Sequence, residues 1–336
     1  MGSDGARHDW TGRSVLVTGA AGFIGSTLVE WLAREGARVR AFVRYNSRNN
    51  FGHLEDLDSE LRKEIEIYAG DLANPEALQL ATRGQDVVLH LGALIPIPYS
   101  FKHAREYVSV NVEGTLNVLE AARQHEVQRV VQVSSSEVYG TAQIVPIPET
   151  HPLHPQSPYA ATKVGADQLA LTYWHAFGLP VVLARPFNTY GPRQSARAVI
   201  PTVITQALTR DRIELGVTST TRDFMFVEDT ARGLARCAEK DGIEGETFNL
   251  GTGLEYSVAD VVRRISEQIG IDLPVQSTEE RQRPGSSEVE RLLCDPTRAH
   301  EILGWHHKVG IDEGLARTIE WVRAHLDSFK PELYNV

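Results

Sequence analysis

Tyr159 and Lys163 have the residue types and the spacing of a base and its activating cation. Four residues apart on a helix, they lie on the same face, one turn from each other. Ser157 and Pro158 directly before them are typical of a helix start. An ammonium near a phenol lowers the pKa of the phenol, which makes Tyr159 a candidate base for a substrate hydroxyl near neutral pH. By itself the spacing also fits an interfacial Tyr beside a solvated Lys.

A Ser-rich strand end lies upstream of this pair. Residues 129–133 read as a buried parallel strand that runs into Ser134, Ser135, Ser136 and Glu137. In open parallel sheets the carboxyl ends of the strands carry the ligands. Three hydroxyls and a carboxylate at such an end indicate a functional site, and a simple turn rich in Ser is the alternative.

A glycine-rich turn near the N-terminus has the setting of a phosphate-binding loop. Residues 13–18 read as a short buried strand, and a helical pattern runs from Ser26 to Glu35. The glycines between them permit a tight turn and close approach of a pyrophosphate, which the N–H groups of the helix start would face. A turn that only joins the two elements is the alternative. The expected cofactor contacts in the turn are Gly19, Gly22, Phe23, Ile24 and Gly25.

The end of the second strand, residues 37–43, bears on the choice of cofactor. An Asp or Glu usually stands there and binds the adenosine ribose, but here the position falls on Val43 or Arg44. An Arg suits a 2′-phosphate and hence NADP, whereas an Arg that stacks on adenine or points to solvent fits NAD. Both cofactors therefore stay open. At the end of the third strand, Asp71 is expected to bond the adenine amino group, or else to cap the helix that Pro75 opens.

The fourth strand, residues 86–93, is expected to run along the cofactor at its exit, where small residues allow backbone contact. The segment from Tyr99 to Gln124 is expected to contain a long helix with an apolar face. Asn111 in its middle is expected to have a structural role, bonded to an adjacent strand or a water. The expected cofactor contacts at this edge, besides Tyr159 and Lys163, are Leu72, Leu91 and Ala93.

The composition excludes several classes of protein. With 336 residues, the chain is expected to form one large or two intimately joined domains. Its net charge of −10 argues against a general nucleic-acid binder. Cys237 and Cys294 give neither a disulfide framework nor metal-ligand spacing, so we expect no metal, inert thiols and a cytoplasmic location. No apolar run has the length of a signal peptide or of a membrane span, so no membrane is expected.

Together these motifs resemble the extended short-chain dehydrogenase/reductase superfamily, in its branch of nucleotide-sugar epimerases, dehydratases and decarboxylases. The resemblance implies an enzyme with bound NAD or NADP that is recycled in each turnover, acting on a nucleotide-diphosphate sugar. The stretches that carry it are Thr18 to Gly25, Ser134 to Gly140, Tyr159 to Lys163, Arg185 to Arg193, and Arg222 to Phe224.

The fold that the resemblance implies is α/β: a Rossmann-type doubly wound parallel sheet with a smaller, discontinuous α/β substrate domain. The expected dinucleotide-binding domain comprises residues 12–190 and 226–254. The expected substrate domain comprises residues 191–225 and 255–330, closed by helices at 295–305 and 311–326. A homodimer is also implied, formed by the helices near 101–124 and 158–177.

The resemblance assigns roles to the residues of the two catalytic motifs. Ser135 hydrogen-bonds the sugar 4-hydroxyl, Tyr159 is the base at that hydroxyl, and Lys163 holds the nicotinamide ribose. Glu137 matches the base that removes the C5 proton in 4,6-dehydratases after C4 has been oxidised. Ser136 stands where glucose-type dehydratases carry Asp, and the mannose-type and legionaminic-pathway dehydratases carry Ser. The stretch from 139 to 201 resembles the legionaminic-pathway type most, which implies a GDP-linked N-acetylhexosamine.

The expected substrate contacts come from the second half of the chain. Asn188 matches a family position that contacts the pyrophosphate or the sugar, although it also suits a turn. Arg222 and Arg283 match arginines that bind the diphosphate, since a guanidinium fork suits phosphate oxygens. Val199, at the start of a helix that would border the nucleotide, is the fourth expected contact.

Two alternatives to a 4,6-dehydratase remain open at this stage. A 4-epimerase or a UDP-glucuronate decarboxylase would use the same scaffold, and the decarboxylases also carry Glu at the position of Glu137. A cofactor-binding regulatory protein that lost turnover is the non-enzymatic alternative, which the intact Ser135, Tyr159 and Lys163 disfavour.

Overall fold

The centre of the molecule is a parallel sheet of seven strands, shown by a computed structural model that describes residues 10–278 and 289–330. The strand order is β11-β6-β5-β4-β1-β2-β3, and every neighbouring pair is parallel. The order reverses between β1 and β4, which is the switch point where doubly wound sheets bind their ligands. The strands are β1 Ser14–Thr18, β2 Arg38–Arg44, β3 Glu66–Gly70, β4 Val87–His90, β5 Arg129–Val133, β6 Val181–Pro186 and β11 Thr247–Leu250.

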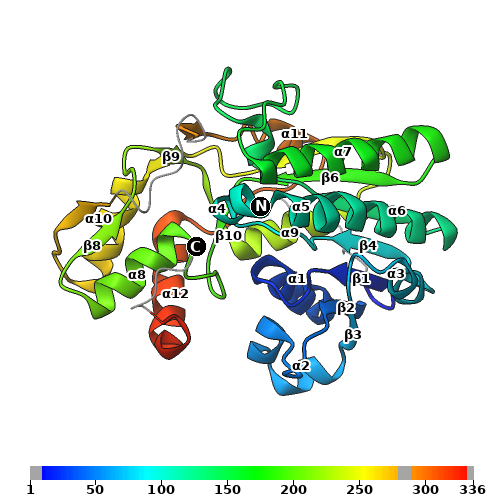
Figure 1. The fold of residues 1–336 in the computed structure, drawn as a ribbon, viewed down its shortest axis with the longest axis horizontal. Helices are drawn as coiled ribbons and strands as arrows, with labels where there is room; N and C mark the ends of the chain where they lie inside the picture. Colours follow the sequence, from blue (N-terminus) through cyan, green and yellow to red (C-terminus); the bar gives the residue numbers. More distant parts are fainter. Residues whose placement is uncertain (1–9, 279–288, 331–336) are drawn as a thin grey trace, which may run out of the picture.

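Helices cover both faces of this sheet (Figure 1). On one face, α1 (Phe23–Arg34) packs against α9 (Val227–Glu239), and their apolar side chains form one core with the sheet. On the other face, α3 (Pro75–Thr82), α6 (Gly114–Gln124) and α7 (Pro158–Phe177) form a second core layer. Because the sheet is covered on both sides, β4, β5 and β6 are buried along their whole length. The expected Rossmann-type α/β fold is confirmed.

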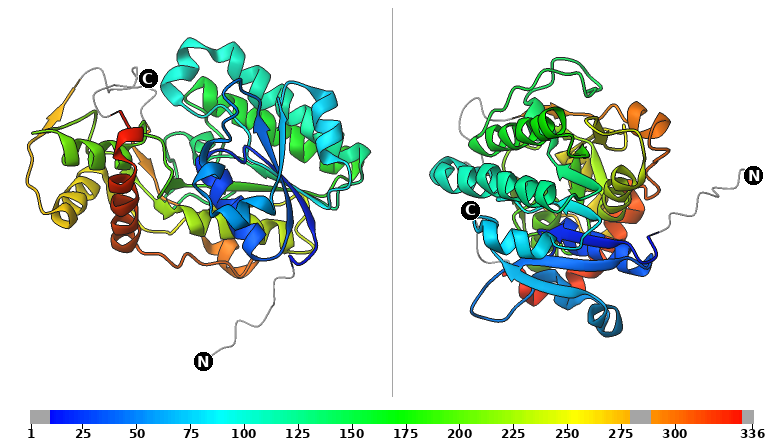
Figure 2. Two further views of the ribbon diagram at one scale, coloured as in Figure 1. Left: turned by 90° about the horizontal axis from the view of Figure 1, so that it is seen from below. Right: turned by 90° about the vertical axis from the view of Figure 1, so that its right-hand side faces the viewer.

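A smaller lobe stands beside the sheet (Figure 2). Strand β6 leads directly into β7 of this lobe, so the carboxyl ends of the central strands point toward it. The lobe has its own apolar core, which Phe23 and Ile24 at the start of α1 also contact. Its elements are β7 Asn188–Tyr190, α8 Val199–Thr209, β8 Ile213–Leu215, β9 Thr221–Arg222, β10 Phe224–Phe226, β12 Tyr256–Ser257, α10 Val258–Ile269, β13 Val275–Ser277, β14 Arg291–Leu292 and α12 Ile311–Ala324.

The segment between residues 99 and 124 contains the expected long helix, which runs from 104 to 124 and widens to a π-helical turn in its middle. The whole segment consists of α4 (Ile97–Lys102), α5 (Ala104–Tyr107), a π-helical segment (Val108–Glu113) and α6. The cause of the π turn lies at Asn111, whose side chain bonds both the backbone N–H (2.8 Å) and the carbonyl (3.0 Å) of Leu94. The wider π turn carries this side chain to the loop after β4. The expected structural role of Asn111 is confirmed.

Two smaller expectations about helices are wrong. The helix expected over 295–305 is only Thr297–Glu301 (α11), and the chain then packs Trp305 into the core of the larger lobe. The cap of α3 is Asn74, whose side chain accepts the N–H of Ala77, so Asp71 does not cap this helix. The remaining short helices are η1 Gly52–Asp56, α2 Ser59–Lys63, η3 Ser136–Tyr139 and η6 Leu326–Ser328.

Both cysteines are free and fully buried. Burial raises the pKa of the Cys237 thiol to about 12 and raises that of Cys294 as well, which confirms inert core thiols. Within residues 10–278 and 289–330, none of the helices combines the length and the apolar character that a membrane crossing requires.

Candidate active site

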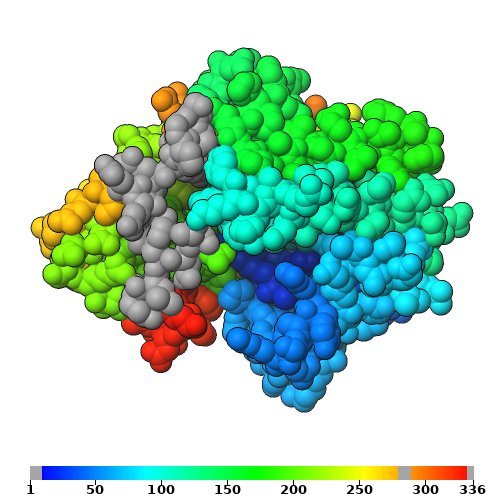
Figure 3. All heavy atoms as spheres, viewed as in Figure 1, coloured from blue at the N-terminus to red at the C-terminus, as the bar shows by residue number. Residues whose placement is uncertain are grey.

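The turn between β1 and α1 has the shape of a backbone cradle. Gly19 has a φ of 70°, and a Cβ there would lie 2.8 Å from the backbone nitrogen of Gly92. Gly22 donates its N–H to the Gly19 carbonyl at 3.0 Å and then caps α1 as an extended residue without a side chain. In the space-filling view, the dark blue start of the chain is visible in a recess between the cyan and the lighter blue segments (Figure 3). An exposed helix start lined only by backbone fits a dinucleotide pyrophosphate.

The other expected cofactor contacts lie along the same edge of the sheet. Arg44 ends β2 and Asp71 follows β3, and their side chains approach to 4.0 Å, although the Arg44 side chain is 82% exposed. Leu72 lies against the chain after β4, since a Cβ on Gly92 would come within 2.7 Å of its Cδ1. Leu91 donates its N–H to the carbonyl of Thr18 at 3.3 Å. These contacts place the ends of β1, β2, β3 and β4 along one edge of the sheet, at the switch point.

A buried histidine joins the glycine turn to the helical layer. The Thr115 hydroxyl donates to a backbone carbonyl at 2.6 Å, so it must accept its 3.0 Å bond from His90 Nε2. His90 Nδ1 therefore accepts from the Thr18 hydroxyl at 2.6 Å, and Thr18 accepts the N–H of Gly92 at 3.1 Å. Burial, with a smaller contribution from the Lys163 charge, lowers the pKa of His90 to about 3. His90 is therefore a neutral side chain that links β1 to the helical layer by hydrogen bonds, and it does not act as a general acid.

The Ser-rich segment forms a short turn at the end of β5. Ser135 caps η3, and its side-chain oxygen accepts the N–H of Glu137 at 3.2 Å. A side-chain hydrogen bond also joins Ser135 to Tyr159. Glu137 lies close enough for its charge to act on Tyr159, whereas Ser136 is buried. The structure thus brings a hydroxyl, a carboxylate and a phenol together.

The expected effect of Lys163 on Tyr159 is not seen in this arrangement. Burial raises the pKa of the Tyr159 phenol to about 12, the Ser135 hydrogen bond lowers it, and the charges of Glu137 and Asp167 raise it. The Lys163 ammonium donates to the carbonyl of Val133 at 2.6 Å. Burial lowers the pKa of Lys163 to about 8, and Asp167 opposes that effect. Burial therefore dominates the pKa of the phenol, and Ser135 is the group that lowers it.

The chain from residue 16 to 318 matches the protein family described as GDP-mannose 4,6 dehydratase. The chain belongs to this family. It is 36% identical over 316 residues to a UDP-glucose 4-epimerase of Mycolicibacterium smegmatis, covering 92% of this chain and 98% of that protein. It is 34% identical over 323 residues to a dTDP-glucose 4,6-dehydratase of Streptomyces griseus, covering 94% and 96%.

A solved structure of similar fold is dTDP-glucose 4,6-dehydratase from Streptomyces venezuelae with NAD and TYD bound. It superposes with a TM-score of 0.84 at 30% identity, covering 95% of this chain and 99% of that one. These findings confirm the resemblance to the nucleotide-sugar dehydratases and epimerases of the extended short-chain dehydrogenase/reductase superfamily. The chain is an enzyme of that branch.

Three of the four expected substrate contacts of this family member lie in the smaller lobe. Asn188 is on β7, and its Oδ1 is buried with no hydrogen-bond partner among the described residues. Val199 begins α8. Arg222, on β9, is buried and donates to the carbonyls of Thr221 (2.8 Å) and Glu290 (3.4 Å). Arg283 lies outside the described residues.

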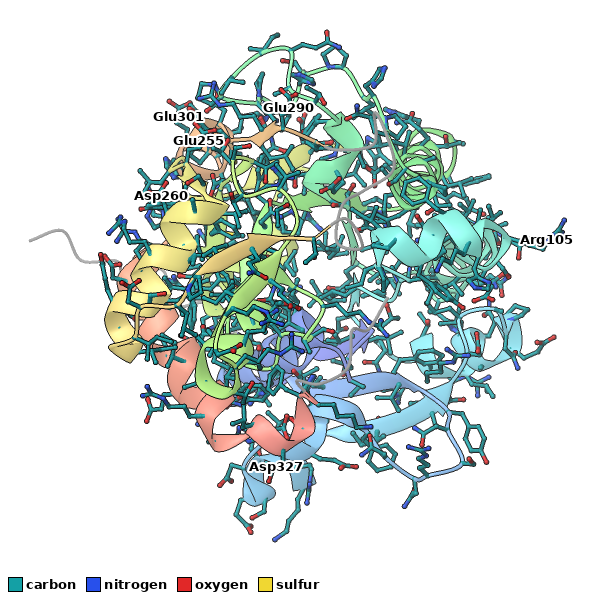
Figure 4. All side chains as sticks on the ribbon, turned by 60° about the vertical axis from the view of Figure 1, so that its left-hand side comes forward. Arg105, Glu255, Asp260, Glu290, Glu301 and Asp327 are labelled. Carbon is teal, nitrogen blue, oxygen red and sulfur yellow. The ribbon has the colours of Figure 1, made fainter. Side chains whose placement is uncertain are left out.

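Figure 4 labels residues of the smaller lobe and Arg105 of α5 on opposite sides of the molecule. Glu255 and Glu290 lie next to the starts of β12 and β14, the two strands that flank β9. Arg105, on α5, points away from the molecule on the opposite side. The Arg222 backbone therefore belongs to a sheet of the smaller lobe, whereas the catalytic side chains belong to the large sheet and α7.

Sequence reasoning missed a buried ion pair below the catalytic cluster. Asp167 lies on α7 and Arg185 on β6, with a guanidinium nitrogen 3.1 Å from a carboxylate oxygen. Asp167 follows Tyr159 and Lys163 at the same four-residue interval, which puts all three on one helix face. That spacing was the signal that could have found it.

Proposed function

We propose that this enzyme is a nucleotide-sugar 4,6-dehydratase. The observation that carries the proposal is the position of Glu137, a second base beside Tyr159. Ser135 connects the two, because it bonds the Tyr159 side chain and accepts the Glu137 N–H. Oxidation of C4 requires one base, and loss of water across C5 and C6 requires another.

The residues divide the proton transfers between them. Ser135 binds the sugar 4-hydroxyl, and Tyr159 takes its proton. Glu137 then takes the proton from C5, which is acidic once C4 is a carbonyl, and the C6 hydroxyl leaves as water. The two protons taken up by Tyr159 and Glu137 balance the one that the leaving hydroxyl needs and the one that returns to C5 when hydride is delivered to C6. Ser136 is buried on the same short turn as this base. When bound, the dinucleotide supplies a positive ring that favours the phenolate and a hydride acceptor for C4 that is also the donor for C6.

The cofactor in our proposal is NAD, because the related dehydratase of Streptomyces venezuelae holds NAD. Gly19, Gly22 and Gly25 would hold the pyrophosphate, and Lys163 the nicotinamide ribose. Arg44 is placed to meet a 2′-phosphate, so NADP stays a second candidate.

We propose a nucleotide-diphosphate sugar as substrate, bound by Asn188, Val199, Arg222 and Arg283. The unpartnered Oδ1 of Asn188 supports this, since a buried amide oxygen usually has a donor. The proposed domain boundaries, 12–190 with 226–254 and 191–225 with 255–330, differ from the two apolar cores at β7, which packs in the smaller lobe, and at α11, which packs in the larger one. We propose that the sugar binds between the two lobes.

A 4-epimerase is the second candidate function, favoured by the 36% identity to a UDP-glucose 4-epimerase. It would need Tyr159 and Ser135 but no base at C5, so Glu137 would only bind a hydroxyl. The two functions predict different masses for the product.

Mass spectrometry of the products from a panel of UDP-, GDP-, dTDP-, CDP- and ADP-sugars tests the proposal. A dehydratase gives a product lighter by about 18 mass units, one water. A product of unchanged mass with altered chromatography would establish epimerisation instead. Release of carbon dioxide from UDP-glucuronate would establish a decarboxylase, and no product from any sugar would favour a regulatory protein.

We also propose a cytoplasmic homodimer that pairs the helices near 101–124 and 158–177. Exposed apolar side chains on this surface support it, since Val108 and Leu116 are 46% and 38% exposed and Phe177 is 57% exposed. Light scattering should give twice the chain mass, and Leu116→Arg should halve it. A wild-type chain that is monomeric at all concentrations would contradict the dimer.

A further inference from the structure

Asp167 is a fully buried carboxylate that the proposed chemistry does not use. It lies on α7 and its side chain has no exposed surface. Its Oδ2 accepts the Ser134 hydroxyl at 2.6 Å and the Arg185 guanidinium at 3.1 and 3.3 Å. Its Oδ1 is buried with no hydrogen-bond partner among the described residues. A buried anion is costly unless its surroundings compensate the charge, so its place next to the catalytic cluster needs a reason.

The ion pair holds the catalytic turn at both ends. Asp167 binds the hydroxyl of Ser134, the first residue of the turn. Arg185 donates to the hydroxyl of Tyr139, the last residue of η3, at 3.0 Å. The Tyr139 hydroxyl in turn donates to Asn249 on β11 at 2.8 Å. The turn that carries the proposed catalytic residues Ser135 and Glu137 is therefore held at both ends by the ion pair of Asp167 and Arg185.

The same carboxylate is the anion nearest in sequence to the buried Lys163. Asp167 follows Lys163 by four residues, so the two lie one helical turn apart on one face. A second titratable group that interacts with this ammonium is His90 from β4, which is neutral because burial lowers its pKa to about 3. Burial raises the pKa of Asp167, whereas the charges of Arg185 and Lys163 and the Ser134 hydrogen bond lower it. Of these two groups, Asp167 is the one whose charge raises the pKa of Lys163.

We propose that Asp167 is a positioning residue for the reaction. Through the Ser134 hydroxyl it fixes the turn that presents Ser135 and Glu137, and through its charge it keeps Lys163 an ammonium. Arg185 also fixes this turn, because it donates a hydrogen bond to Tyr139 at the other end of the turn. This inference rests on the proposed function for the roles of Ser135 and Glu137. Its charge term, the effect of the Asp167 charge on the protonation of Lys163, does not depend on the substrate.

The charge term is tested on Lys163 directly. The chain has only six lysines, so the holoenzyme labelled with ¹³C-ε-lysine gives few signals, and Lys163→Arg assigns one of them. Asp167→Asn keeps the shape and the hydrogen-bond acceptor but removes the charge. We expect the titration of Lys163 to move down by about one pH unit or more. An unchanged titration would mean that Asp167 is already neutral, and would overturn the proposal.

A matched control separates this effect from general loss of a buried charge. Asp229 is equally buried and accepts the backbone N–H groups of Lys308 and Val309 at 3.0 Å. Asp229→Asn should lower stability and leave the Lys163 titration in place. If Asp167→Asn does not fold, the double variant with Arg185→Gln removes both charges together. The same downward direction is expected there, because Lys163 still lacks its anion.

The positioning term is tested by Ser134→Ala, which leaves every charge in place. We expect kcat to fall roughly ten-fold or more, with the KM and the pH limbs of the rate unchanged, because the turn loses its anchor. An unchanged kcat would overturn this part. Absence of dehydratase activity in the wild-type enzyme would contradict the proposed function instead, while the Lys163 titration still decides the charge term.

Discussion

The catalytic end of the large sheet and the facing smaller lobe are built in opposite ways. At the end of β5, buried side chains bond one another, as in the contacts from Ser134 to Asp167 at 2.6 Å and from Arg185 to Tyr139 at 3.0 Å. In the smaller lobe, Asn188 Oδ1 has no partner among the described residues, and Arg222 donates to backbone carbonyls. The reaction is therefore determined by a fixed cluster, whereas recognition is left to separate side chains on shorter elements. Families of this fold can then keep one chemistry and change the substrate.

The fixed cluster predicts the largest effect for removal of the proposed base. Tyr159→Phe should lower kcat by about 10³-fold, because the phenol has no substitute within the turn. The fold should persist, since the ring still packs edge-on against Tyr107. Steady-state kinetics with the sugar from the mass-spectrometry panel measure the effect, and circular dichroism checks the fold. A loss below ten-fold would place the base elsewhere.

Glu137→Gln tests whether C4 oxidation and loss of water depend on different residues of the same cluster. We expect water loss to slow by about 10²-fold or more, while oxidation at C4 still proceeds. The enzyme should then stall after the first step, with a rise in the near-ultraviolet absorbance of reduced nicotinamide. Ser136→Ala, a neighbour on the same turn, is the control and should not stall. Full activity of the Glu137 variant would remove the observation on which the dehydratase proposal rests.

A variant of the smaller lobe, Asn188→Ala, should affect the KM, whereas Tyr159→Phe and Glu137→Gln affect the rate. Asn188→Ala should raise the KM for the nucleotide sugar by roughly ten-fold with little change in kcat, because it removes binding and not proton transfer. Thr189→Val is the matched control: its side chain points to the other face of β7 and bonds Thr230 at 2.9 Å. If kcat falls for Asn188→Ala while the KM stays, recognition and chemistry are not separated in this way.

The smallest effect is expected at the exposed rim of the cofactor site. Arg44→Ala should weaken NADP binding by about ten-fold or less and leave NAD binding nearly unchanged, since an exposed ion contact contributes little. Arg40→Ala, on the same strand but bonded to Glu66 at 2.8 Å, is the control. Calorimetric titration of protein stripped of cofactor measures both constants. Equal losses for both cofactors would assign Arg44 to adenine.

The sequence predicted well what depends on local spacing. The strands, the glycine turn and the grouping of Ser135, Glu137 and Tyr159 at one sheet end followed from motif order and strand polarity. It failed where the outcome depends on contacts between distant residues. Burial decides the pKa of Tyr159, and burial is a property of the whole fold. For the ion pair of Asp167 and Arg185, the helical spacing puts Asp167 on the face of Tyr159 and Lys163, but it does not indicate that Arg185 on β6 is the partner.

The helix between residues 99 and 124 shows the same limit. Its propensity and apolar pattern favour one continuous helix, but Asn111 bonds Leu94 in another segment and a π turn results. Substrate identity is the extreme case. In our proposal it depends on Asn188, Arg222 and other residues of the smaller lobe, and relatives of comparable identity are named for different nucleotide sugars.

The central claim is that Glu137 takes the C5 proton after oxidation at C4. It is tested most directly with a substrate that carries deuterium at C4, identified from the panel, and a parallel reaction of unlabelled substrate in deuterated water. A dehydratase predicts that the deuterium from C4 appears at C6 of the product, and that solvent deuterium appears at C5. Deuterium retained at C4, with no exchange at C5, would contradict the account and establish an epimerase.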